Sequence, residues 1–165
     1  VPEDRKKEGL VLQMDIQSNI ALGCRHASVL RNSQQEIKMA EAYRERLRIK
    51  CSSLKQLTGK LSGGNQQKVI ISKCLLQKPK VLILDEPTRG IDVVAKAEVH
   101  ALIGELVERG VSVILISSEY DEVIGMCDRI AVLYEGRSIG IVDRKDFSEE
   151  LLLSMSHGAG RQEYC

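Results

Sequence analysis

The sequence predicts an α/β protein with a mainly parallel sheet. The apolar runs VLIL (81–84) and VSVILIS (111–117) are short and nearly free of polar residues, which is typical of buried parallel strands. A helical apolar pattern over about 93–109 lies between them. Two parallel strands need such a crossover helix, and the connection is right-handed in nearly all proteins.

The N-terminal half predicts a helical subdomain. Residues 1–30 read as irregular, with Pro2, Gly9 and Gly23 as punctuation. The motif SQQE (33–36) is a capping box, so we expect a helix from there to about Lys50. One face of that helix would hold Ala40, Tyr43 and Leu47. A loop over 51–64 and a second helix over 65–78, ended by Pro79, would follow.

The C-terminal half predicts the crossover helix, a short helix, a hairpin and a last helix. Gly110 suits the C-terminal cap of the crossover helix. EYDEVIGMC (119–127) reads as a short helix, and 129–142 as a hairpin turning at Glu135 and Gly136. DFSE (146–149) would cap the last helix. The core-facing residues of the crossover helix would be Ala95, Val99, Leu102, Ile103 and Leu106.

Composition excludes several classes of function. Among 165 residues, 24 Lys and Arg stand against 23 Asp and Glu, and aromatic residues are only 3%. Neither an electrostatic footprint nor a stacking platform for nucleic acid is present. No apolar stretch approaches the roughly 20 residues of a membrane helix. Five cysteines without CxxC spacing leave two interpretations, a metal or disulfide site and plain reduced thiols. The chain begins with Val1 instead of Met, so we expect a fragment of a longer protein.

Two segments suggest chemistry. VLILDEP delivers Asp85 and Glu86 to the C-terminal edge of a strand, where open α/β sheets bind ligands. Adjacent carboxylates there suit a cation and a reacting water, although a solvated acidic turn explains them equally well. Before that strand, LSGG begins a helix whose exposed backbone amides form an anion site, with Ser62 adding a hydroxyl. Gly63 and Gly64 would allow a phosphate to approach closely, or would simply be flexible residues at a helix cap.

The two segments occur in order, joined by one helix and a Pro-ended turn. The run LSGGNQQKVIISKCLLQKPKVLILDEPTRGID resembles the signature, Walker B and D-loop segments of the ATP-binding subunits of ABC transporters. VPEDRKKEGLVLQMDIQSNI and ISSEYDEVIGMCDRIAVLYEGR are similar to the C-terminal half of the duplicated ATPases that import ribose, galactose and related sugars. The resemblance covers nearly the whole chain and implies a partial P-loop NTPase fold. It would divide the chain into a helical subdomain (1–78), a core (79–128) and a C-terminal hairpin and helix (129–165).

The resemblance also implies roles for individual residues, with ATP and Mg²⁺ as cofactors. Asp85 would hold Mg²⁺ through water, Glu86 would polarise the attacking water, and Asp92 would lie in the D-loop. The signature residues would contact the γ-phosphate of ATP held by another ATPase half, and Ser118 would stand at the switch position. The signature residues are Ser62, Gly63, Gly64, Asn65 and Gln66.

The chain departs from the family pattern in four ways. No G-x-x-x-x-G-K-[ST] loop is present, so the isolated chain should bind ATP poorly and hydrolyse none. Asn65 replaces the more frequent glutamine, and Glu3 falls near the position of the Q-loop glutamine. Ser118 stands where the family usually has a histidine, and serine carries no positive charge. None of the three histidines fills that position: His26, His100 and His157.

These features lead to the hypothesis of a transport-coupled ATPase in which this half's own nucleotide site is weak or non-hydrolytic. Its signature would serve the opposite, active site. The implied partners are another ATPase half, transmembrane permease subunits and, indirectly, a sugar-binding protein, at the cytoplasmic face of a bacterial-type membrane. Residues 16–23 and the helix after them would face the permease. Two alternatives stay open: an ABC-type ATPase that acts on DNA or the ribosome, and an inert dimerising or docking fragment.

Overall fold

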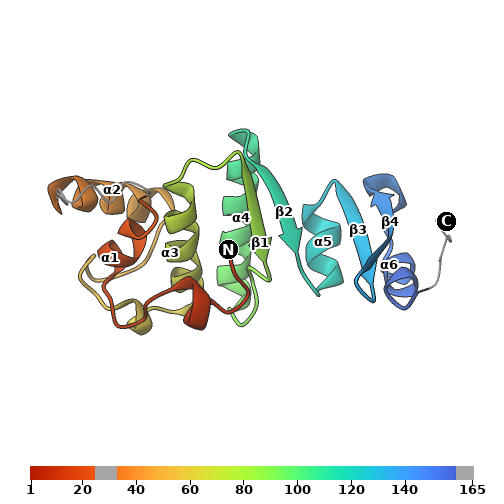
Figure 1. Cartoon of the computed structure of the whole chain (residues 1–165), viewed down its shortest axis with the longest axis horizontal. Helices are drawn as coiled ribbons and strands as arrows, with labels where there is room; N and C mark the ends of the chain where they lie inside the picture. Colours follow the sequence, from red (N-terminus) through yellow and green to blue (C-terminus); the bar gives the residue numbers. More distant parts are fainter. Residues whose placement is uncertain (25–32, 159–165) are drawn as a thin grey trace. The chain divides into compact units, whose positions relative to one another are not determined.

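The computed structural model describes residues 1–24 and 33–158, in which helices precede the first strand and strands follow only from Val81 onward (Figure 1). The chain divides into two compact units, residues 1–114 and 115–165. The first unit holds the N-terminal helices and strand β1, and the boundary falls within strand β2. Its elements are a π-helical turn Arg5–Gly9, α1 (Ile16–Ala21), α2 (Ser33–Arg46), a 3₁₀ turn Thr58–Lys60, α3 (Gly63–Leu75), β1 (Val81–Asp85), α4 (Val93–Glu108) and β2 (Ser112–Ile116).

Helix α1 is a feature that the sequence pattern did not predict, since residues 1–30 read as irregular. The Asp15 carboxylate caps it by accepting a 2.7 Å hydrogen bond from the backbone of Ser18. Ile16 and Ile20 are fully buried, and α1 packs against α2 and α3. With six residues α1 is too short to show a periodic pattern, so burial stabilises it instead. Most of its surface is covered within this chain, which argues against α1 as an open docking face.

Helix α2 ends at Arg46, four residues before the predicted end at Lys50. Arg48 has a φ of 50°, a left-handed conformation that stops a helix. Leu47 and Ile49, on either side, are both buried. The turn therefore continues the apolar face of α2 without continuing its helix. The capping side chain predicted at Ser33 lies outside the described residues.

Helix α4 confirms its predicted face, and its buried side chains are Ala95, Val99, Leu102, Ile103 and Leu106. Gly110 follows with a φ of 84°, as expected of a C-terminal cap. Helix α4 connects β1 to β2, which pair as neighbouring parallel strands (Figure 1). The predicted α/β class is therefore confirmed.

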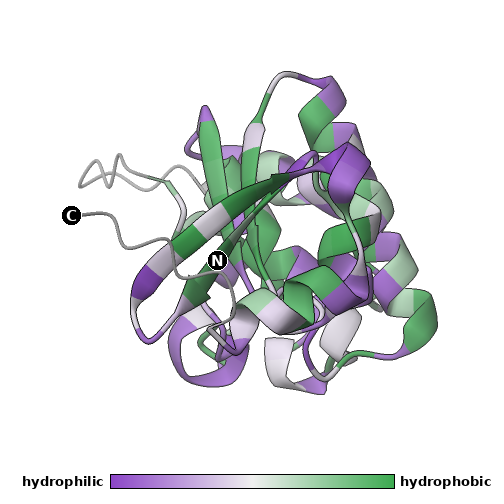
Figure 2. Cartoon of the chain, turned by 90° about the vertical axis from the view of Figure 1, so that its right-hand side faces the viewer, coloured by the Kyte–Doolittle hydropathy of each residue, from purple (hydrophilic) through white to green (hydrophobic). Residues whose placement is uncertain are grey.

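Both strands differ from the prediction of full burial. Along β1 the side chains alternate, so that Leu84 is completely buried while Ile83 is 51% exposed. Ile114 and Ile116 on β2 are also about half exposed. Figure 2 shows the strands coloured mainly as hydrophobic and the helices banded in both colours. An apolar strand fits a sheet covered on both faces, but the elements described here cover one face of this sheet.

The second unit contains α5 (Tyr120–Met126), β3 (Arg129–Tyr134), β4 (Arg137–Asp143), a 3₁₀ turn Arg144–Asp146 and α6 (Glu149–Ser156). Strands β3 and β4 form the predicted antiparallel hairpin. Glu135 and Gly136 turn the chain with φ values of 47° and 75°, as a two-residue turn of this kind requires. Within the predicted capping segment DFSE, Ser148 caps α6 by accepting a 3.1 Å bond from the backbone of Leu151. A small apolar core joins hairpin and helix: Ile130, Val132, Val142 and Leu152.

Candidate functional site

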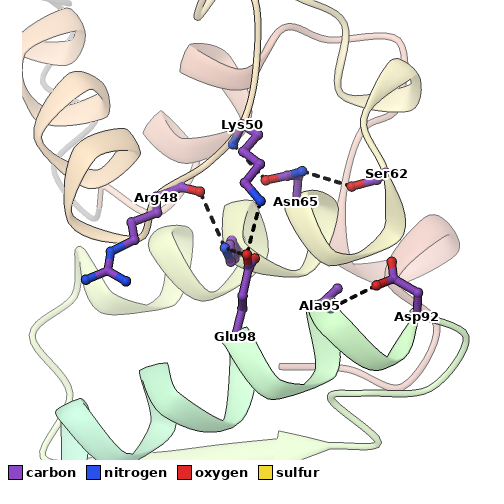
Figure 3. Close-up of polar contacts among 8 residues, drawn as sticks. Arg48, Lys50, Ser62, Asn65, Asp92, Ala95 and Glu98 are labelled. Carbon is purple, nitrogen blue, oxygen red and sulfur yellow. Dashed lines mark hydrogen bonds and ion pairs between the residues drawn. The ribbon is translucent and has the colours of Figure 1, made fainter.

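The front of α3, which comprises residues 62–65, has no side-chain cap within the part of the chain that the structure describes. Ser62 occupies the cap position, but its hydroxyl accepts a 2.8 Å hydrogen bond from the Asn65 side chain (Figure 3). The first intrahelical bond runs from the Gln66 amide to the Ser62 carbonyl. Because Ser62 does not cap the helix, the amides at its start stay available to an external acceptor and carry the positive end of the helix dipole.

Gly63 and Gly64 have a packing role that the sequence interpretation missed. A Cβ on Gly64 would lie 2.5 Å from the Cβ of Ala95 on α4, closer than real side chains come. A Cβ on Gly63 would lie 3.2 Å from the carbonyl oxygen of Gly90. The glycines therefore let α3 approach α4 and the loop before it, whatever they also do for a ligand.

A polar network supports the front of α3 (Figure 3). The Asn65 side-chain oxygen accepts a 2.8 Å bond from the backbone of Lys50. The Lys50 ammonium lies 3.1 Å from the Glu98 carboxylate, and the buried Lys68 ammonium lies 2.7 Å from the same carboxylate. Hydrogen bonds from Lys68 and then Lys50 lower the pKa of Glu98. Glu98 thus links α4 to α3 and to the segment that precedes it.

The carboxylates after β1 lie at a sharply bent turn. Asp85 is the last residue of β1 and is half-buried. Glu86 follows with a φ of 44°, a left-handed conformation that is uncommon for a residue with a side chain. Asp92 caps α4, because its carboxylate accepts a 2.9 Å bond from the backbone of Ala95. The loop thus presents one carboxylate at the strand end and uses another to begin the next helix.

A shallow pocket of about 110 Å³ opens between the first turns of α3 and α4. It brings together four predicted site residues, which are Ser62, Gly64, Asn65 and Asp92. Lys50, Ala95 and Glu98 also line it, and sequence reasoning missed all three. Nothing local marked them as site residues, since Lys50 was predicted as the end of a helix and Ala95 as a core-facing residue, and Glu98 belongs to no recognised motif.

Five predicted site residues are not among those that line this pocket: Gly63, Asp85, Glu86, Gln66 and Ser118. Gln66 is buried, and its side-chain nitrogen lies 3.3 Å from the carbonyl oxygens of Thr58 and Leu61. Gln66 thus holds the loop before α3, whereas a direct ligand contact would require it to leave that position. Ser118 is exposed in the second unit.

The histidines and cysteines form no recognisable metal site within the described residues. His157 bonds the carbonyl of Leu153 at 2.8 Å at the end of α6, and His26 lies outside the described residues. Among residues 1–24 and 33–158, no group of three or more His, Cys, Asp or Glu side chains could hold a metal ion. Cys24, Cys51, Cys74 and Cys127 are free thiols. Burial raises the pKa of Cys127, which disfavours a reactive thiolate there.

Within residues 1–24 and 33–158, every helix falls short of the length and apolarity needed to cross a bilayer.

A family model described as ABC transporter matches residues 3–89, which include the front of α3 and the carboxylates of Asp85 and Glu86. The chain belongs to the ABC transporter family. This confirms the family resemblance that the LSGG and VLILDEP segments indicated.

Curated relatives of this ABC transporter chain are named as sugar-import proteins. It is 49% identical over 160 residues to the xylose import ATP-binding protein XylG of Moorella thermoacetica, across 96% of this chain and 32% of the relative. It is 45% identical over 159 residues to the ribose import ATP-binding protein RbsA of Lactococcus lactis subsp. cremoris, across 94% and 32%. The chain therefore spans about a third of the length of these relatives.

Solved structures confirm the fold of this ABC transporter chain. A dimeric ATP-binding cassette in a post-hydrolysis state bound to ADP and Pi superposes with a TM-score of 0.71 at 20% identity. That match covers 86% of this chain and 62% of the other. CbiO1 from Clostridium perfringens, part of an ABC transporter complex, gives a TM-score of 0.66 at 27% identity, covering 88% and 55%.

Proposed function

We propose that this chain is part of an ATP-binding subunit that energises import of a simple sugar, as the C-terminal half of a duplicated ATPase. The observation that carries the proposal is the similarity to the xylose and ribose import proteins across at least 94% of the chain. An L-arabinose transport ATP-binding protein, AraG of Geobacillus stearothermophilus, is also 46% identical across 99% of the chain and 32% of its own length. These relatives disfavour a role on DNA or the ribosome.

The front of α3 would contact the γ-phosphate of ATP held by another ATPase half. Support comes from the uncapped amides of the helix and from the Ser62 hydroxyl, which Asn65 holds at the surface. One oxygen of the Asp92 carboxylate accepts from the Ala95 amide at the start of its own helix, where the positive end of the helix dipole offsets part of its charge. Lys50 and Lys68 offset the charge of Glu98, which lines the pocket. The site therefore suits an anion despite two nearby carboxylates.

Asp85 would hold Mg²⁺ through water, and Glu86 would polarise the attacking water. Asp85 fits this role because it is a half-buried oxygen donor at a strand end. One carboxylate is enough, since Mg²⁺ in nucleotide sites takes its other ligands from water and phosphate. When bound, the ion would neutralise developing phosphate charge. With Ser118 in place of a histidine, this half offers the γ-phosphate a hydrogen bond without a positive charge.

The two nucleotide sites of the assembled ATPase would therefore differ in activity. This chain's own site would be weak, while its α3 amides would complete the site that turns over. Its partners would be the second ATPase half and membrane permease subunits at the cytoplasmic face of the membrane. A sugar-binding protein would act indirectly. The three-part division at residues 78 and 128 stays a prediction.

Substitutions in the assembled transporter test the proposal. Ser62→Arg places a long side chain over the amides and should lower ATP turnover by about 10²–10³-fold, the cost of removing a positioned donor from a transition state. Glu86→Gln should change turnover by less than about threefold if this half's site contributes little. Ser53→Arg is the matched control, because Ser53 is exposed in the loop before α3.

Two results would contradict the proposal. If Glu86→Gln abolished hydrolysis while Ser62→Arg left it intact, the roles of the two half-sites would be reversed. If neither substitution changed sugar uptake or ATP turnover, the chain would be a docking module without a part in hydrolysis. A titration of the isolated chain with ATP and Mg²⁺ tests the alternative of an inert docking fragment. Micromolar affinity would show that these 165 residues contain a complete phosphate-binding site.

A further inference from the structure

Residues 1–5 run beside the end of β1 and the turn that follows it. The backbone nitrogen of Val1 donates to the Ile83 carbonyl at 2.8 Å, and the Val1 carbonyl accepts from the Asp85 amide at 3.1 Å. Glu3 then forms an ion pair with the Arg89 side chain. The segment therefore follows the strand end and the loop of residues 86–90 without a break.

Arg5 makes the most specific of these contacts. One terminal nitrogen donates to the Arg89 carbonyl at 2.6 Å and the other to the Gly90 carbonyl at 2.8 Å. The planar guanidinium fork can bind two successive carbonyls in one geometry, whereas an ammonium group acts as a point charge. Gly90 has a φ of 66°, so these two carbonyls belong to a turn that few residue types could form.

The same guanidinium group borders the front of α3. A Cβ on Gly63 would lie 2.9 Å from the Arg5 Nη2 atom and 3.2 Å from the Gly90 carbonyl oxygen that this atom binds. The start of α3, the turn at Gly90 and the tip of Arg5 are thus packed against one another. All three lie within the first compact unit.

The surroundings of Arg5 argue against a purely stabilising role. Its Nε atom is buried and, within the described residues, has no hydrogen-bond partner. An unpaired buried donor opposes folding, and an apolar side chain would avoid that penalty. The gain from arginine here is therefore the fixed arrangement of the two carbonyls.

We propose that Arg5 is a positioning residue that fixes the loop of residues 86–92 against the front of α3. This inference rests on the proposed function, because that loop carries Glu86 and Asp92 and the α3 front carries Ser62. Arg5 acts on this loop through its hydrogen bonds to the carbonyls of Arg89 and Gly90. Its effect would be to hold the spacing between the two parts of the nucleotide-facing surface.

Arg5→Lys in the assembled transporter is the main test, since lysine keeps the charge and the volume but loses the fork. We expect kcat for ATP hydrolysis to fall about tenfold with KM for ATP within about twofold, because a small misplacement of positioned groups lowers the rate more than the binding. Arg137→Lys is the matched control, because Arg137 is exposed on β4. An unchanged kcat in Arg5→Lys would overturn the proposal.

Hydrogen exchange on this 165-residue chain supplies a readout that does not depend on ATPase activity. The amides of Arg89 and Ile91 bond within the loop at 3.2 and 3.3 Å, so their protection reports its order. Arg5→Lys should speed exchange over residues 86–92 about tenfold while the hairpin of residues 129–143 stays unchanged. Equal exchange in both proteins would refute the positioning role. If the wild-type transporter hydrolysed no ATP, the proposed function would fail, and the exchange result would still decide the role of Arg5.

Discussion

Replacing Glu98 by alanine should destabilise the chain by leaving a buried ammonium group without its counter-charge. Lys68 is only 3% exposed, and among the described residues it also donates a hydrogen bond to the Arg48 carbonyl at 3.4 Å. Breaking a fully buried ion pair costs about 3–5 kcal/mol, whereas an exposed pair is worth about 0–1 kcal/mol. Glu98 is 36% exposed, which places the pair between these limits. We therefore expect Glu98→Ala to lower the free energy of unfolding by about 2 kcal/mol.

Urea unfolding followed by circular dichroism measures this loss, and Glu105→Ala is the control on the exposed face of the same helix. A double-mutant cycle with Lys68→Met separates the pair from the rest of α4. In the Lys68→Met background, Glu98→Ala should cost less than about 0.5 kcal/mol, because no buried charge remains to be stranded. A cost below about 0.5 kcal/mol in the wild-type background, or an equal cost in both backgrounds, would refute the reasoning.

The same pair predicts a pH dependence of stability. Lys68 and Lys50 lower the pKa of Glu98 below its ordinary value of 4.5. The unfolded chain therefore takes up the proton first as the pH falls, and stability drops between that value and the lower folded-state pKa. Unfolding curves from pH 7 to pH 3 should show the difference between wild type and Glu98→Ala shrinking below about pH 4.5, the ordinary carboxyl range. A difference that stayed constant down to pH 3 would contradict this assignment.

Further substitutions test the packing and the backbone conformation. Gly64→Ala should cost about 1–3 kcal/mol in urea unfolding because its Cβ would lie 2.5 Å from that of Ala95, and Ala95→Gly in the same chain should recover most of it. Asn19→Ala should cost about 2–3 kcal/mol in the same assay, because its fully buried amide bonds the preceding loop, whose polar groups would be left unpaired. Gly136→Ala should lower the melting temperature, because an alanine at a φ of 75° costs about 1–2 kcal/mol of folding free energy in the hairpin turn. Gly104→Ala, inside α4 with open space around it, should instead stabilise by about 0.5–1 kcal/mol; equal effects of the two alanines would contradict the backbone argument.

Local rules account for the parts of the fold that were predictable. The buried face of α4 follows from apolar residues at helical spacing, and the hairpin turn follows from a glycine that tolerates positive φ. The position of Ser62 at the start of a helix also follows from local signals. These features depend on neighbours within a few residues, which the sequence order already brings together.

The candidate site was only partly predictable, because its support comes from distant segments. Ser62, Gly64, Asn65 and Asp92 line one pocket as a motif-based prediction would have it, but Lys50 and Glu98 join them from other elements. Gln66 belongs to the same motif and yet points into the core. A motif gives the residue types in order, whereas the direction of each side chain depends on what packs around it.

The amino-acid sequence alone determined the α/β class, the periodic helix faces, the hairpin and the position of the LSGG motif at the start of a helix, because each depends on short-range backbone preferences. Only the tertiary structure decided that α1 is a helix, that residues 1–24 and 33–158 leave one face of the β1–β2 sheet uncovered, and that Arg5 meets the carbonyls of Arg89 and Gly90. Burial and long-range hydrogen bonds join residues more than eighty positions apart, and no local pattern records which partners will meet.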